Sequence, residues 1–261
     1  MKIVVLTSNA IRHRFVANTI TQMADASLVV CEAKPSDAGA PAEKTAPDPV
    51  DEHFRLRFET EAAVFGGHTS FQSPVLPILY RELNLPHVVD VIRGFSPDFT
   101  VVFGSSIIRE PLLSLLPRGR IINIHLGLSP YYRGAGTNFW PFVNDELQYV
   151  GATLLHLDAG VDTGNIISHV RPAFESSDDV HTTGCKVVEA AVHRAVEVVQ
   201  RLAAGKSLPN VKQWTAEKSR YYRSRDFDRQ ALDRYLTNLN NGIVREYLAN
   251  PAPAPRLIEL A

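Results

Sequence analysis

The chain has 261 residues, 45% of them hydrophobic, with 27 lysines and arginines against 28 aspartates and glutamates. This is the composition of a globular protein with a sizeable core, and a formal net charge of −1 provides no general attraction for nucleic acid or anionic membranes. Cys31 and Cys185 are far apart and lack a CxxC partner, so we expect buried free thiols rather than a disulfide scaffold or a zinc site. The N-terminal apolar run is too short for a signal peptide, and no stretch reaches the ~20 apolar residues of a membrane span, which predicts a cytoplasmic protein.

The first part of the chain follows the pattern strand, helix, strand. These elements are expected at residues 2–7, 8–25 and 27–33. Ser8 or Asn9 is expected to cap the helix, and Ile11, Phe15 and Ile20 are expected to face inward. Strand, helix and strand in this order open a doubly wound α/β sheet.

Residues 33–50 are rich in proline, alanine and charge, which predicts a mobile loop. The next helix is expected at residues 51–67, with Phe54, Phe58 and Phe65 along one side. Further elements are strands at 99–104, 120–125, 150–160 and 164–170, a helix at 109–117 and a long capped helix at 177–205. The fold class is therefore α/β, a Rossmann-like doubly wound and mostly parallel sheet.

The character of the sequence changes after Gly205. We expect a catalytic domain over residues 1–205 and a small C-terminal subdomain over residues 206–261, whose tail is extended. The basic and aromatic stretch RYYRSRDF, residues 220–227, could stack single-stranded nucleic acid, but a packing surface for the subdomain is the favoured interpretation.

Polar side chains gather in the stretch NIHLGLSPYYRG, residues 123–134, at the end of a predicted central strand. Asn123 and His125 are two positions apart, so they point the same way at the edge where α/β sheets bind ligands. Asp162 lies in a glycine-flanked turn between the next two strands, which could bring it beside His125.

Three other interpretations of these residues were weighed. Asn123 and His125 could cap a helix or bond a loop backbone, and DTG at Asp162 could be an ordinary turn. A metal site would draw on His125, His156, Asp158 or Asp162, but recognised ligand spacing is lacking and we expect no metal. Ser129 lacks the GxSxG elbow of a serine hydrolase.

The combined pattern resembles the folate-dependent formyltransferase family, whose signature is Asn-x-His, Ser-x-x-Pro, Arg-Gly and Asp-x-Gly. The resemblance covers roughly residues 1–205 and is strongest over residues 99–167. It implies that Asn123, His125 and Asp162 are the catalytic residues and that 10-formyltetrahydrofolate is the formyl donor. An amine would attack the formyl carbon, Asn123 would donate to the oxyanion, and His125 and Asp162 would handle the proton.

The resemblance also suggests binding residues. Backbone groups near Ser106, Ile108, Asp158 and Ala159 are expected to hold the folate. Asn9, Arg12 and Arg14, at the exit of the first strand, are expected to face the acceptor, where arginine and a helix N-terminus suit a diphosphate. A solvated helix face is the alternative for this second group.

The acceptor was inferred by elimination within the family. The ribonucleotide transformylase has a glycine-rich phosphate loop after its first strand, whereas this chain has TSNAIRHRF. The tRNA enzyme carries a larger C-terminal barrel domain, and the formyltetrahydrofolate hydrolase carries an N-terminal regulatory domain. The remaining expectation is an amine on a nucleotide-linked sugar for polysaccharide biosynthesis, with no nucleic acid or membrane partner and a homodimer left open. Another small amine, such as hydroxyornithine or a ribonucleotide, and a non-catalytic relative that binds folate or a nucleotide sugar stay open as alternatives.

Overall fold

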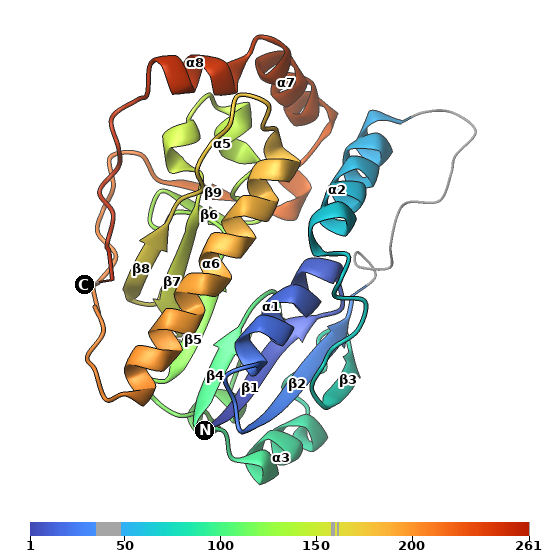
Figure 1. Cartoon of the computed structure of the whole chain (residues 1–261), viewed down its shortest axis with the longest axis vertical. Helices are drawn as coiled ribbons and strands as arrows, with labels where there is room; N and C mark the ends of the chain where they lie inside the picture. Colours follow the sequence, from blue (N-terminus) through green and yellow to red (C-terminus); the bar gives the residue numbers. More distant parts are fainter. Residues whose placement is uncertain (35–47, 158–159, 161, 261) are drawn as a thin grey trace.

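The computed structural model describes residues 1–34, 48–157, 160 and 162–260, and its centre is a seven-stranded sheet (Figure 1). The strand order is β3-β2-β1-β4-β5-β7-β8. The strands are β1 Lys2–Ser8, β2 Ala26–Ala33, β3 Val75–Leu79, β4 Phe99–Val102, β5 Ile121–His125, β7 Ala152–His156 and β8 Ile166–Val170. The first five in the sheet order pair in parallel, whereas β7 is antiparallel to both β5 and β8. The predicted α/β fold with a mostly parallel sheet is confirmed.

Helices cover both faces of this sheet, as the doubly wound pattern requires. One face carries α1 Ile11–Thr21, α2 Pro49–Phe65 and α6 Val180–Ala203, and the other carries α3 Pro86–Phe95 and α4 Leu112–Leu115 (Figure 1). Alternate side chains of β1 serve the two layers: Ile3 and Val5 belong to the α1–α6 cluster, and Val4 and Leu6 to the α3–α4 cluster. Burial on both faces explains why β1 is apolar along nearly its whole length.

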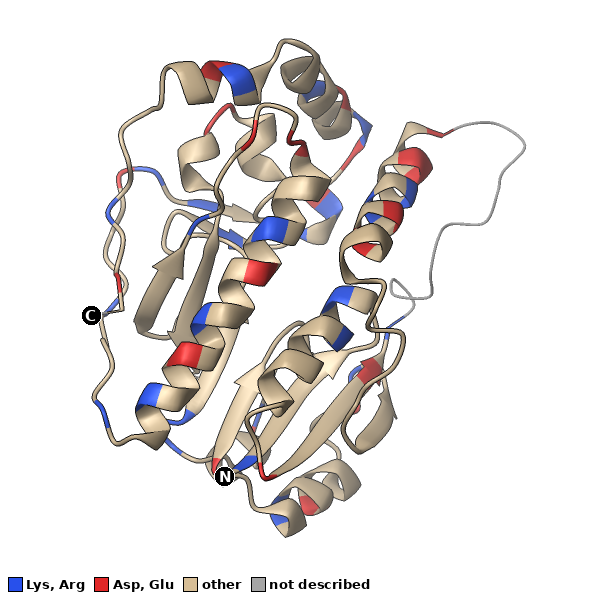
Figure 2. Ribbon diagram, viewed as in Figure 1, with Lys and Arg blue, Asp and Glu red and all other residues tan. Residues whose placement is uncertain are grey.

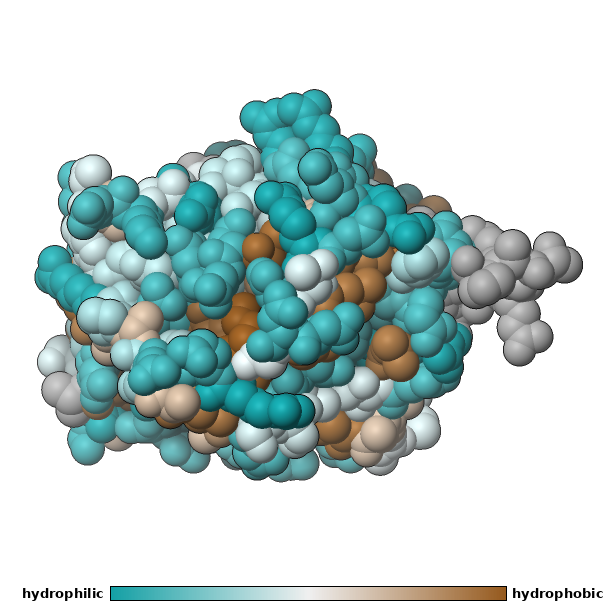
Figure 3. Space-filling view, turned by 90° about the horizontal axis from the view of Figure 1, so that it is seen from above, coloured by the Kyte–Doolittle hydropathy of each residue, from teal (hydrophilic) through white to brown (hydrophobic). Residues whose placement is uncertain are grey.

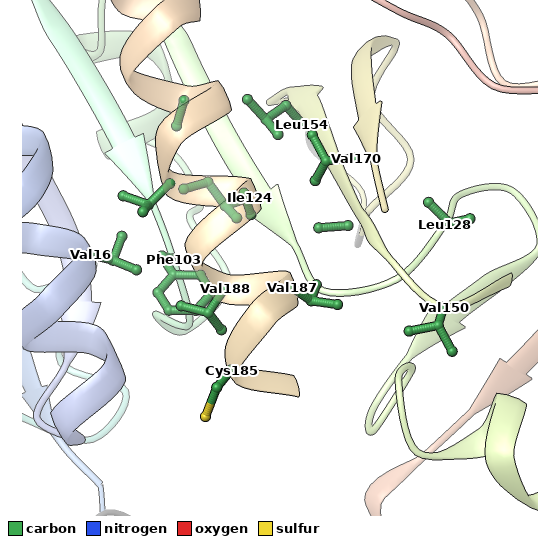
Figure 4. Close-up of a cluster of buried hydrophobic side chains, with 14 of the residues drawn as sticks. Val16, Phe103, Ile124, Leu128, Val150, Leu154, Val170, Cys185, Val187 and Val188 are labelled. Atoms are coloured by element: carbon green, nitrogen blue, oxygen red, sulfur yellow. The ribbon is translucent and has the colours of Figure 1, made fainter. Parts of the chain in front are cut away.

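Helix α6 packs against β5, β7 and β8 (Figure 4). Its Val187 and Val188 are at most 2% exposed and belong to the same cluster as Phe103 after β4 and Ile124 of β5. The helix begins at a capping box, in which the side chain of Asp179 accepts from the first-turn backbone. Cys185 is among these buried residues, and the prediction of buried free thiols at Cys31 and Cys185 is confirmed.

Some local predictions differ from the structure. Neither Ser8 nor Asn9 caps α1; Ser8 is the last residue of β1, and the N-cap position is Ala10, which makes no side-chain cap. Phe65 is buried, whereas Phe54 and Phe58 are each 39% exposed, so the three phenylalanines are not equally part of the core. Strand β3 and helix α3 are among the elements that were not predicted, and α4 is shorter than expected. Most of the predicted 33–50 loop lies outside the described residues.

In Figure 1 the C-terminal residues lie over the upper end of the sheet and return along its β8 edge. Strand β9 (Arg220–Tyr222) pairs with β6 (Tyr132–Gly134) as a separate two-stranded parallel sheet, followed by α7 (Arg229–Asn240) and α8 (Ile243–Ala249). The remaining short helices are α5 Trp140–Val143, η2 Leu147–Tyr149 and η3 Ser224–Asp226. Residues of α7 and α8 belong to the same hydrophobic cluster as α1 and α6. The ring of Tyr222 stacks on Trp140 with centroids 4.0 Å apart, as a packing surface would.

The surface reflects the balanced composition. Lysine and arginine alternate with aspartate and glutamate along α2 and α6 (Figure 2). Seen from above, at the end where α2, α7 and α8 lie, hydrophobic residues are visible among hydrophilic ones (Figure 3). In the part of the chain that the structure describes, no helix combines the length and the apolar composition needed to cross a membrane.

Candidate active site

Three polar side chains meet at the end of β5. Asn123 and His125 occupy alternate positions of this strand, so both project from the same face. Asp162, between β7 and β8, accepts a hydrogen bond at Oδ1 from Nδ2 of Asn123 at 3.1 Å. Its Oδ2 lies 3.2 Å from Nδ1 of His125. The structure therefore brings together the three side chains that the sequence selected, with His125 only 6% exposed.

The second ring nitrogen of His125 is also occupied. Nε2 lies 3.1 Å from the backbone carbonyl oxygen of Tyr132. A carbonyl oxygen can only accept, so Nε2 carries a proton and donates it. The other ring nitrogen, Nδ1, faces the carboxylate of Asp162. This pair is arranged to share one proton, as a group that transfers protons requires.

The three side chains line a cavity of about 1130 Å³. Pockets for one small ligand usually hold roughly 300–1000 Å³, so this cavity has room for more than one reactant. One wall follows the loop after β4, and a second wall follows α1, α2 and the start of α6. Asn123, His125 and Asp162 belong to the lining of the same cavity.

Side chains from outside the loop after β4 fix its conformation. The buried carboxylate of Glu32 accepts the N–H of Ser106 at 2.6 Å. Asn84 donates to the carbonyl of Ile107 at 2.8 Å and accepts the N–H of Arg109 at 2.7 Å. These three hydrogen bonds hold the backbone of the loop that lines the cavity.

The predicted folate residues divide into two groups. Ser106 and Ile108 line the cavity in this loop. Within the described residues, Oγ of Ser106 is buried without a hydrogen-bond partner, which leaves a polar atom for a ligand to satisfy. Asp158 and Ala159 lie outside the described residues.

The wall formed by α1, α2 and the start of α6 carries a partly buried ion-pair cluster of Arg12, Arg57 and Glu61. Nη1 of Arg12 lies 2.9 Å from both carboxylate oxygens of Glu61, and Nε of Arg57 lies 2.8 Å from Oε1. Burial raises the pKa of Glu61, but the two arginines prevail and lower it overall, so the carboxylate stays charged. Two guanidinium groups therefore flank one carboxylate in this cluster.

Three histidines of the same wall are uncharged at neutral pH. The rings of His53 and His181 are 4.6 Å apart. Burial, together with the neighbouring His181 and Arg57, lowers the pKa of His53 to about 3. Burial also lowers the pKa of His181 and, with the charge of Arg12 added, holds that of His13 well below its usual range. Their rings can offer hydrogen bonds without adding charge.

The predicted acceptor residues are not all on this wall. Arg12 lines the cavity. Oδ1 of Asn9 accepts the N–H of Lys34 at 3.2 Å, and Nη1 of Arg14 donates to the carbonyl of Thr69 at 3.0 Å. Across the described residues, neither Asn9 nor Arg14 is part of the cavity lining.

Sequence reasoning missed several groups of the site. Glu32 was detectable, because a carboxylate at the end of the apolar run SLVVCEA needs buried partners. Glu61 gave no signal among the other charges of α2. The carbonyl of Tyr132 could not be found at all, since every residue has one.

The residues of the metal alternative are described only in part, because Asp158 lies outside the described residues. His125 and Asp162 are adjacent, but Nε2 of His156 lies 3.3 Å from the carbonyl of Pro209. Over the described ranges, no group of three or more His, Cys, Asp or Glu side chains is arranged to hold a metal ion.

The fold and this site define an α/β protein with an amide, an imidazole and a carboxylate at the end of a central strand. The family model described as formyl transferase matches residues 1–199. The chain belongs to the formyl transferase family, which confirms the resemblance read from the sequence.

Curated relatives match about half of the chain. The methionyl-tRNA formyltransferase of Citrifermentans bemidjiense is 30% identical over 135 residues, 51% of this chain and 42% of the relative. That of Caldanaerobacter subterraneus is 32% identical over 127 residues, 48% of this chain and 40% of the relative. The matched part of the chain thus spans less than half the length of these relatives.

Solved structures are similar over nearly the whole chain. An N-formyltransferase from Helicobacter canadensis, solved with folinic acid and dTDP-3-aminofucose, has a TM-score of 0.56 at 15% identity, covering 91% of this chain and 80% of its own. A 4-N formyltransferase from Francisella tularensis has a TM-score of 0.57 at 17% identity, covering 91% of this chain and 87% of its own. The phosphoribosylglycinamide formyltransferase of Anaplasma phagocytophilum has a TM-score of 0.55 at 19% identity, covering 85% of this chain and 97% of its own. At these identities the likeness shows the shared fold.

Proposed function

We propose that this protein transfers the formyl group of 10-formyltetrahydrofolate to a primary amine on a nucleotide-linked amino sugar. The observation that carries the proposal is the meeting of Asn123, His125 and Asp162 in the lining of one cavity in a formyl transferase chain. Formyl transfer needs a hydrogen-bond donor for a developing oxyanion and a group that accepts and returns a proton. These three side chains have the required chemistry.

The wall formed by the loop after β4 fits the folate donor. Ile108, Val102 and Leu157 give it an apolar surface, and the buried Oγ of Ser106 and backbone groups add polar contacts. 10-Formyltetrahydrofolate would supply the activated formyl group. Folinic acid, a stable formyl-folate, is present in the Helicobacter canadensis structure of the same fold.

The roles of the three side chains follow from their hydrogen bonds. Asn123 has an amide that donates, so it would stabilise negative charge on the formyl oxygen. His125, held at Nε2 by the carbonyl of Tyr132, would exchange a proton at Nδ1. Asp162 would orient Nδ1 and accept or relay the proton that the amine loses.

The wall of α1 and α2 supports an anionic acceptor. Three basic side chains, Arg12, Arg57 and Lys34, line the cavity, and the two arginines pair with Glu61. A diphosphate is the kind of group that arginine binds well, because its fork of N–H donors matches the phosphate oxygens. The uncharged rings of His53 and His181 could contact the sugar or base. An acceptor that combines phosphate and sugar therefore suits this wall.

A direct assay tests the proposal. The purified protein is incubated with 10-formyltetrahydrofolate and dTDP-, UDP- or GDP-linked amino sugars, and formamido product and tetrahydrofolate are measured by mass spectrometry. The Asp162→Asn variant is the control for enzyme-dependent transfer. We expect product with at least one nucleotide sugar and a far slower reaction with the free amino sugar.

The other outcomes separate the alternatives. Turnover of hydroxyornithine, a ribonucleotide amine or methionyl-tRNA, with no transfer to nucleotide sugars, would leave formyl transfer standing and reject the sugar acceptor. Binding of folinic acid without transfer to any amine would favour a non-catalytic relative. No binding of folinic acid would reject the folate donor.

A further inference from the structure

Gln213 contacts the loop that carries Asp162 from the segment between α6 and β9. Its Nε2 lies 2.7 Å from the carbonyl oxygen of Asp162 and 2.9 Å from that of Gly164. A side-chain amide has two N–H groups, so one can serve each carbonyl. Gln213 lies outside residues 1–199, which the family model matches.

The backbone of Asp162 needs such support. Its φ is +52°, in the left-handed region that residues with a side chain seldom adopt, although aspartate tolerates it better than most. From this backbone the carboxylate must reach Nδ2 of Asn123 and Nδ1 of His125 together. A small rotation of the peptide would break at least one of these contacts.

We propose that Gln213 is a positioning residue of the active site: its amide holds the backbone of Asp162 so that the carboxylate meets His125. The inference rests on the proposed formyl transfer, because it assigns Gln213 a role in that proton-transfer step. Gln213 itself acts through Asp162. A misplacement of about 1 Å at a reacting group can cost as much as a hundredfold in rate.

Other contacts hold the same two chain segments together. Nδ2 of Asn165 donates to Oδ1 of Asn210 at 2.8 Å, and Ile166 and Val211 exchange backbone hydrogen bonds at 2.7 and 3.0 Å. These bonds remain when the amide of Gln213 is removed, so the segment should stay in place. Asn210→Ala is therefore the matched control, since it removes one side-chain bond between the same segments.

The first test compares Gln213→Met with this control. Methionine retains the length of the side chain but has no donors. We expect Gln213→Met to lower kcat about 10- to 100-fold while KM for donor and acceptor stays within about twofold. Asn210→Ala should retain wild-type kcat. An equal effect of both variants, or an effect of Gln213→Met on KM alone, would overturn the proposal.

The second test is a double-mutant cycle with Asp162→Asn. If Gln213 acts through the carboxylate of Asp162, the double variant should be no slower than Asp162→Asn alone, within about twofold. Fully additive losses would show that Gln213 supports the fold rather than the carboxylate, and would overturn the proposal.

A readout without substrate keeps this inference separate from the proposed function. Long-range ¹H–¹⁵N spectra report the hydrogen bonding of the His125 ring nitrogens. We expect Gln213→Met to move the Nδ1 resonance of His125 in the direction that Asp162→Asn moves it, while Asn210→Ala leaves it in place. An unchanged Nδ1 resonance in Gln213→Met would overturn the positioning role. Failure of the wild-type protein to transfer formyl to any amine would instead count against the proposed function.

Discussion

The carboxylate of Glu32, at the end of β2, accepts the backbone N–H of Ser106 at 2.6 Å and so ties β2 to the loop after β4. Its other oxygen, Oε1, accepts the N–H of Arg81 at 3.0 Å, and Nζ of Lys34 lies 4.0 Å from Oε2, the oxygen that Ser106 contacts. Glu32 is 0% exposed, and a buried carboxylate is tolerated only with such partners. One side chain therefore holds the backbone of two segments that line the cavity.

Replacing Glu32 by alanine should weaken the binding of formyl-folate. Two backbone N–H groups would lose their acceptor, each at a cost of about 1–3 kcal/mol where water cannot replace it. We expect the Kd for folinic acid to rise about tenfold or more, measured by isothermal titration calorimetry. Glu59→Ala, which removes an exposed carboxylate on α2, is the control. An unchanged Kd in a folded Glu32→Ala protein would show that this loop does not hold the folate.

Substitution of the three central side chains should abolish most of the turnover. Asn123→Ala, His125→Ala and Asp162→Asn should each lower kcat by about a hundredfold or more, the usual loss for an oxyanion donor or an acid–base group. Single-turnover formyl transfer to the identified acceptor measures this loss. His87→Ala, at an exposed position of α3, is the control for histidine removal. Near-wild-type rates in all three variants would place the chemistry elsewhere in the cavity.

The long apolar strands and the capped helix were predictable because their signals are local. The buried run of β1, the alternate Asn123 and His125 of β5, and Asp179 at the start of α6 each follow from periodicity or cap chemistry. Strand β3 has only five residues, one of them proline, and is largely exposed, so its pattern is indistinct. Its place is set by pairing with β2, which no local pattern reveals.

The site was predictable only where side chains carry the chemistry. Asn123, His125 and Asp162 have residue types that stand out in sequence. The carbonyl of Tyr132, the N–H of Ser106 and the contact of Gln213 with Asp162 depend on how distant segments meet. Arg12 and Arg14 look alike in sequence, but only the fold pairs Arg12 with Glu61 and directs Arg14 to Thr69.

The two arginines of α1 should differ in their effect on the acceptor. Arg12→Ala removes a guanidinium from the cavity wall, so we expect KM for a nucleotide sugar to rise about tenfold, the scale of a charge-assisted hydrogen bond. Arg14→Ala, on the same helix but bonded to Thr69, should leave this KM within about twofold. Steady-state kinetics at saturating donor measure both values.

Thermal unfolding controls for the lost ion pair of Arg12 with Glu61. If Arg12→Ala lowered Tm while KM stayed unchanged, the cluster would serve to hold α2 and not to bind the acceptor. An equal rise of KM in both variants would indicate a general effect of charge.

His169 should make the stability of the protein sensitive to acid. Nε2 donates to the carbonyl of Ser129 at 2.7 Å, and Nδ1 accepts the N–H of Ile258 at 2.8 Å, so the folded ring is neutral. Burial lowers its pKa to about 4, against about 6.5 in an unfolded chain. Between these values the unfolded chain binds a proton that the folded chain does not, so the contribution is fully present above pH 6.5 and is lost as the pH falls toward 4. From pH 7.5 to 5 the wild type should therefore lose about 2 kcal/mol more free energy of unfolding than His169→Gln, which cannot be charged. Urea unfolding of both proteins at the two pH values measures this difference, and equal losses would show that His169 is not protonated on unfolding.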